Sequence, residues 1–90
     1  RSGVEAAQLR VKMAVDRVSA ADQALAAAKA ARVTAQLNLE RQNALAAKGL
    51  TSTRNVELAV LEAAQRDADV DRLQATLNAA RSEQQSLDAE

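Results

Sequence analysis

In the first half of the chain, hydrophobic residues recur every seven positions. One set is mostly large, and a second set, three residues further along, is mostly alanine. The first set is Val4, Val11, Val18, Leu25 and Leu39, with Arg32 interrupting it; the second is Ala7, Ala14, Ala21, Ala28 and Ala35, followed by Gln42. A seven-residue repeat of this kind is typical of one narrow seam of a left-handed coiled coil. The pattern therefore predicts a helix over about residues 3–47.

The second half of the chain repeats the pattern. One set of seam positions is Val56, Ala63, Val70 and Leu77, and the other is Ala59, Leu73, Ala80 and Leu87, with Arg66 interrupting the seam. This periodicity predicts a second helix over about residues 53–89.

The two helices are expected to pair with each other in antiparallel fashion. If the chain folds back near residue 50, the numbers of facing residues add up to about 100. Arg32 then lies close to Ala68, and Arg66 lies close to Thr34. Both seams are interrupted at one level, where two long basic side chains can extend to solvent. The coincidence favours this pairing.

Residues 48–52 are predicted to form the turn. Gly49 suits the C′ position of a helix, where a left-handed backbone conformation costs glycine nothing. Leu45 and Leu50 then occupy the C3 and C″ positions, which touch each other in a Schellman motif.

Ser52 is predicted to cap the second helix, because its hydroxyl can accept a hydrogen bond from a free backbone amide. A complete capping box needs Glu or Gln three residues further on, and this chain has Asn55 there. The predicted cap is therefore incomplete.

Composition supports an all-α fold, a long antiparallel two-helix coiled-coil hairpin. The chain has 90 residues, of which 48% are hydrophobic, but it has no aromatic residue and no proline. Much of the hydrophobic share is alanine, the strongest helix former. Strands need clusters of β-branched and aromatic residues, and no such cluster occurs.

Charge and hydropathy argue against several kinds of partner. Twelve basic and twelve acidic residues cancel, whereas a nucleic-acid-binding protein normally carries a basic face. The same balance argues against a polybasic helix on a membrane surface. No apolar run approaches the roughly 18 residues that span a bilayer.

The chain starts with Arg and has no signal-peptide pattern, so we interpret it as a fragment of a larger protein, a single hairpin over residues 1–90.

Catalytic and metal-binding patterns are missing from the sequence. There is no histidine and no cysteine, which removes the usual general base, thiolate nucleophile and zinc ligands. Asp67, Asp69 and Asp71 imitate the start of a calcium loop, but its sixth position is Arg72 and its twelfth is Asn78. We therefore expect a solvated helix face there, with Glu62 and Arg66 paired at i,i+4 spacing. Neither an enzyme nor a bound cofactor is expected.

The residues around the turn resemble a known family. From Arg41 to Ser52 they read Arg-Gln-Asn-Ala-Leu-Ala-Ala-Lys-Gly-Leu-Thr-Ser, which fits R-x-x-x-L-x-x-x-x-x-x-S. This is similar to the tip motif of periplasmic adaptor proteins, or membrane-fusion proteins, of the hemolysin-secretion and multidrug-efflux type. Residues 53–65 also look like the start of that family's second hairpin helix. The architectural resemblance covers the whole chain.

The resemblance implies a function. Adaptors of this family are anchored to the inner membrane and assemble in the periplasm, usually as hexamers, over an inner-membrane transporter. Their hairpin tips meet a TolC-type outer-membrane channel. By resemblance, Arg41 supplies charge-assisted hydrogen bonds to the channel, Leu45 an apolar contact and Ser52 a polar contact. Asn55 departs from the acidic residue often found there.

Other interpretations stay open at this point. Leu45 can close the turn with Leu50, Ser52 can serve only as a cap, and Arg41 can be simply solvated. The main alternative function is a coiled-coil spacer of an unrelated protein, in which the turn only reverses the chain. A lipid-binding helix pair of apolipoprotein type fits less well, because the apolar stripe is narrow and aromatic residues are missing.

Overall fold

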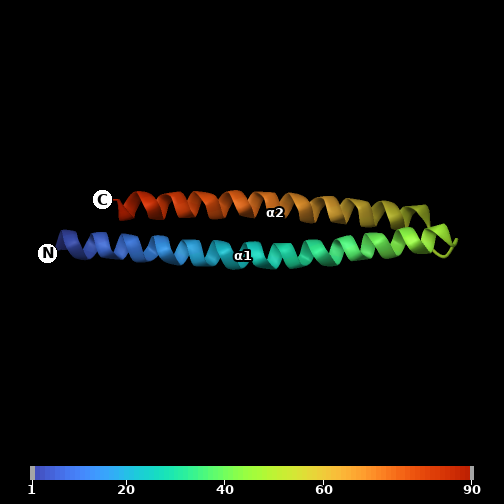
Figure 1. The fold of residues 1–90 in the computed structure, drawn as a ribbon, viewed down its shortest axis with the longest axis horizontal. Coiled ribbons are helices and arrows are strands. Elements are labelled where there is room, and N and C mark those ends of the chain that lie inside the picture. Colours follow the sequence, from blue (N-terminus) through green and yellow to red (C-terminus); the bar gives the residue numbers. More distant parts are fainter. Residues whose placement is uncertain (1, 90) are drawn as a thin grey trace.

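The protein is a long hairpin of two helices (Figure 1). The computed structural model describes residues 2–89, with the side chain of Ser2 left out of the description. Helix α1 spans Ser2–Ala47 and helix α2 spans Thr53–Asp88. They run antiparallel, so the first and last described residues lie toward one end of the rod, called the base, and the turn lies at the other end, called the tip. The rod measures 72 × 14 × 14 Å.

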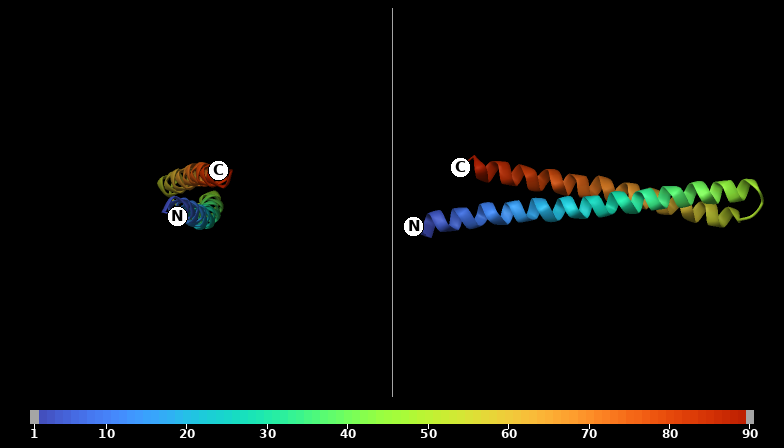
Figure 2. Two further views of the ribbon diagram at one scale, coloured as in Figure 1. Left: turned by 90° about the vertical axis from the view of Figure 1, so that its left-hand side faces the viewer. Right: turned by 60° about the horizontal axis from the view of Figure 1, so that its bottom comes forward.

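The fold predicted from the sequence is confirmed. The described residues form an all-α antiparallel hairpin, and its helices cross at a shallow angle, as Figure 2 shows. Helix α1 begins one residue before the predicted start, and α2 ends one residue before the predicted end. Residues 1 and 90 of the predicted hairpin lie outside the described residues.

The predicted seams form the interface between the helices. Every buried hydrophobic residue in the described part of the chain occupies a predicted seam position: Ala14, Ala21, Leu25, Ala35, Ala59, Ala63, Val70 and Leu77. Leu25, Val70 and Leu77 join Ala21 in one core cluster, onto which Val18, Ala28 and Leu73 pack. The largest apolar side chains of the interface therefore gather in its middle and base half.

Val4 departs from the prediction, because 61% of its surface is exposed although it occupies a seam position. Helix α2 ends at Asp88, whereas the antiparallel pairing would place the partner of Val4 further along the chain. The first turns of α1 therefore have no described helix opposite them, as the longer α1 in Figure 1 shows.

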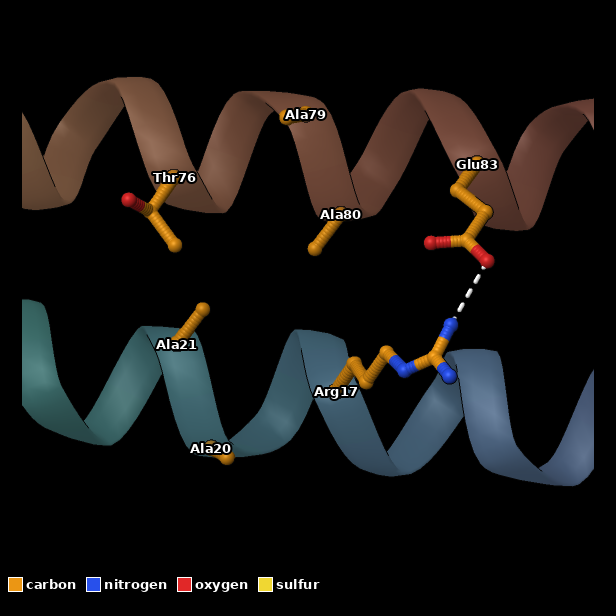
Figure 3. A pocket seen from close by; sticks show the side chains of 7 residues that line it. All are labelled: Arg17, Ala20, Ala21, Thr76, Ala79, Ala80 and Glu83. Carbon is orange, nitrogen blue, oxygen red and sulfur yellow. Dashed lines mark hydrogen bonds and ion pairs between the residues drawn. The ribbon is translucent and has the colours of Figure 1, made fainter.

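An ion pair between the helices reports the register. The Nη1 atom of Arg17 lies 2.7 Å from Oε1 of Glu83 (Figure 3), and the two residue numbers add up to the predicted value of 100. Beside this pair, Ala21 and Ala80 point toward each other across the interface. The side chains of Arg17 and Glu83 are 54% and 48% exposed, so the pair contributes at most about 1 kcal/mol. The apolar seam, not this pair, holds the helices together.

Arg66, which interrupts the second seam, is half-buried and bonds to acidic residues of its own helix. Its guanidinium lies 3.9 Å from Glu62 and 3.3 Å from Asp69, so the predicted pair with Glu62 is confirmed. Arg72 reaches Asp69 from the other side, at 3.8 Å. The guanidinium of Arg66 therefore keeps polar partners while its stem lies beside the seam.

Candidate functional site at the hairpin tip

The turn after α1 has the hydrogen bonds of a Schellman motif. The amide of Leu50 donates to the carbonyl of Leu45 at 2.8 Å, and the amide of Gly49 donates to the carbonyl of Ala46 at 3.0 Å. Gly49 has a φ of 71°, in the left-handed region where only glycine avoids a steric cost. The chain thus reverses direction at the glycine that the sequence singled out.

Replacement of Gly49 by alanine is expected to destabilise the hairpin by about 1–2 kcal/mol. An added Cβ at this position meets nothing within 4 Å, so the expected cost comes from the backbone conformation and not from a clash. The measurement is urea unfolding of the 90-residue chain followed by circular dichroism.

Gly3→Ala is the matched control, because Gly3 lies inside α1 and an added Cβ there also meets nothing within 4 Å. Alanine favours a helix over glycine, so this variant is expected to be at least as stable as the parent. Equal destabilisation by the two variants would contradict the assignment of strain to the turn.

Ser52 caps α2. Its backbone is extended, with φ −85° and ψ 157°, and its hydroxyl accepts a hydrogen bond from the amide of Asn55 at 3.1 Å. Its carbonyl accepts the first helical bond, from the amide of Val56 at 3.2 Å. This is the N-cap geometry expected for serine.

The side chains of Gln42, Thr51 and Asn55 form a chain of hydrogen bonds across the turn. The sequence did not predict this contact. The amide Nδ2 of Asn55 donates to the hydroxyl of Thr51 at 3.0 Å, and that hydroxyl donates to Oε1 of Gln42 at 2.9 Å. We call this set the tip relay. The sequence marked Asn55 as the wrong residue for a capping box and as a departure from the acidic residue often found there in the motif. Nothing in the seven-residue repeat relates Thr51 to Gln42.

The three residues of the motif all lie at the tip, on the last turns of α1 and directly after the turn. Arg41 is exposed, and within residues 2–89 its side chain makes none of the hydrogen bonds or ion pairs that the structure contains. Leu45 stands four residues later, on the same face of the helix, and is half-buried. Leu50 is 69% exposed. The predicted contact between the Leu45 and Leu50 side chains stays a prediction.

The tip is positively charged. Residues 41–54 include Arg41, Lys48 and Arg54 and no acidic residue. All three side chains are exposed, and none takes part in an ion pair within the described part of the chain. A surface with free cationic donors around an exposed leucine suits a partner with carboxylates or carbonyl oxygens beside an apolar spot.

Large apolar side chains also lie outside the seam near the tip. Val33, Leu37, Leu50, Leu58, Val60 and Leu61 are each about half exposed or more, whereas the buried residues at this level are Ala35, Ala59 and Ala63. Val4, Leu9, Met13 and Val15 of the base half are exposed to a similar extent, so exposed apolar side chains occur along the whole rod and do not by themselves mark the tip.

Metal binding and membrane crossing were the other two possibilities considered for the described residues. No group of three or more His, Cys, Asp or Glu side chains among them is arranged to hold a metal ion. Within residues 2–89, neither helix combines the length and the apolar character that crossing a bilayer requires.

Comparisons with known protein families, with curated proteins and with solved structures found no match to this chain. Its fold is that of an antiparallel helical hairpin, and the tip is its candidate site. The tip combines a fixed turn with exposed basic and apolar side chains, so the arrangement is suited to contact with another molecule.

Proposed function

We propose that this chain is the helical hairpin of a periplasmic adaptor in a tripartite efflux or type I secretion system. Its tip docks on a TolC-type outer-membrane channel and bridges that channel to an inner-membrane transporter. The observation that carries the proposal is Arg41, which is exposed and unpaired within residues 2–89. It stands at the position where the adaptor motif has its arginine.

The shape of the molecule fits this role. A rod 72 Å long with one turn at its tip carries a small contact surface far from its base. Because the tip is small, one contact is weak. About six tips arranged in a ring bind together, since each attached tip raises the effective concentration of the next. The proposal includes this hexameric assembly in the periplasm, with the intact protein anchored to the inner membrane.

A coiled-coil spacer is the second candidate function. The hydrogen bonds around Gly49 and Ser52 account for the turn without any partner. A spacer needs the glycine and the cap, and it tolerates any helix-forming residue at position 41. The charge at Arg41 therefore separates the two candidates.

Docking is expected to weaken as salt concentration rises, because Arg41, Lys48 and Arg54 face the partner and exposed charges are screened over about 8 Å at physiological ionic strength. The measurement is binding of the hairpin, displayed on a hexameric carrier, to a purified TolC-type channel at increasing sodium chloride. Absence of binding at low salt, with the hairpin still helical, would remove support for docking on such a channel.

A further inference from the structure

The tip relay lies between two backbone motifs and belongs to neither. The Schellman hydrogen bonds end at Leu50, and the capping bond begins at Ser52. Thr51 stands between them. Its hydroxyl is the one group in the described turn that bonds to side chains of both helices, Gln42 of α1 and Asn55 of α2.

Apolar packing provides little restraint at this level. The fully buried residue of the seam nearest the tip is Ala59 in α2, and the apolar residues closer to the turn, Leu45, Ala46 and Val56, are only half-buried. Alanine contributes little contact area, so the relative position of the last turn of α1 and the first turn of α2 depends strongly on the hydrogen bonds that join them.

We propose that Gln42, Thr51 and Asn55 are positioning residues that hold the two sides of the tip in a fixed mutual position. Gln42 directly follows Arg41, and Thr51 directly precedes Ser52. The hydrogen bond between Gln42 and Thr51 therefore also restrains the positions of Arg41 and Ser52 relative to each other. Because a hydroxyl can donate one hydrogen bond while it accepts another, Thr51 completes both bonds at once. The role in docking rests on the proposed function, whereas the role in tip geometry does not.

Distance measurements on the 90-residue chain test the geometric part. The chain has no cysteine, so Ala44→Cys and Glu57→Cys introduce two spin labels at exposed positions on either side of the turn. In this background, Thr51→Val removes the hydroxyl while it keeps the branched shape, and it is expected to broaden the distance distribution. Thr51→Ser keeps the hydroxyl and is expected to restore the narrow distribution.

Two further variants separate positioning from stability. Thr53→Val is the matched control, because Thr53 is exposed and its side chain makes none of the hydrogen bonds found within residues 2–89. Asn55→Glu completes the capping box but removes the amide donor to Thr51. It is expected to preserve thermal stability and still to broaden the distribution. A distribution for Thr51→Val as narrow as that of the parent overturns the proposal.

Channel binding tests the docking part separately. Loss of two neutral hydrogen bonds that orient the tip is expected to weaken binding of Thr51→Val about tenfold or more. Normal binding by this variant, in a system where Arg41→Asp does not bind, overturns the role of the relay in docking. If the parent hairpin binds no channel, the proposed function fails, and the distance measurements still decide the geometric part.

Discussion

Under the proposed function, replacement of Arg41 by aspartate is expected to abolish export by the intact protein while the hairpin keeps its helicity. The side chain of Arg41 is exposed and takes part in no ion pair of the described structure. Its replacement therefore removes no ion pair that stabilises the hairpin. A partner that accepts hydrogen bonds from the guanidinium meets a repelling carboxylate instead. In a ring of about six tips the unfavourable change is repeated at each contact, so avidity is lost together with affinity.

Lys29→Asp is the matched control for this experiment. Lys29 is also an exposed basic residue of α1, but it lies far from the tip, so its reversal is expected to leave export intact. Circular dichroism of both variants checks the fold, and transport of a known substrate through the assembled system measures function. Normal export by Arg41→Asp would favour the spacer interpretation.

Replacement of Leu77 by alanine is expected to destabilise the hairpin by about 2–5 kcal/mol. Leu77 is 1% exposed and belongs to the one cluster in the described structure where large apolar side chains meet across the interface. Its neighbours on α1 include Ala21 and Leu25. A rod only two helices thick has no second layer that can fill the space left by the truncated side chain.

Leu61→Ala provides the comparison within the same helix. Leu61 is 54% exposed, so its truncation is expected to change the free energy of unfolding by less than about 0.5 kcal/mol. Urea unfolding of the 90-residue chain measures both values, and Leu77→Val gives an intermediate value if Leu77→Ala is unfolded in water. Similar effects at the two leucines would contradict a core centred on Leu77.

The interface was predictable because one periodic pattern determines it. Residues such as Ala14, Leu25 and Val70 follow the seven-residue repeat, and side chains on one helical stripe must be buried together. The turn was predictable for a local reason, since Gly49 and Ser52 carry the preferences of helix ends. The interface follows from a constant seven-residue period, and the turn follows from the preferences of a few neighbouring residues.

The tip relay was not predictable in this way. Thr51 and Gln42 are nine positions apart, and their contact depends on the angle at which α2 leaves the turn. Val4 was predicted as a seam residue because the repeat contains no information on where the opposite helix stops. Both ion pairs of Arg66 follow from helical spacing, i,i+4 with Glu62 and i,i+3 with Asp69, although only the first was predicted.

Both ends of the described chain lie together at the base of the rod (Figure 1). Where the two helices pair, their axes lie about 8–10 Å apart, so a hairpin shortened by the unpaired first turns of α1 begins and ends across a gap that many surface loops already span. The hairpin can therefore be grafted into a loop of an unrelated globular host without disturbing that host. Such a chimera would hold the tip well clear of the host surface, and its reach could be tuned by adding or deleting one heptad from each helix.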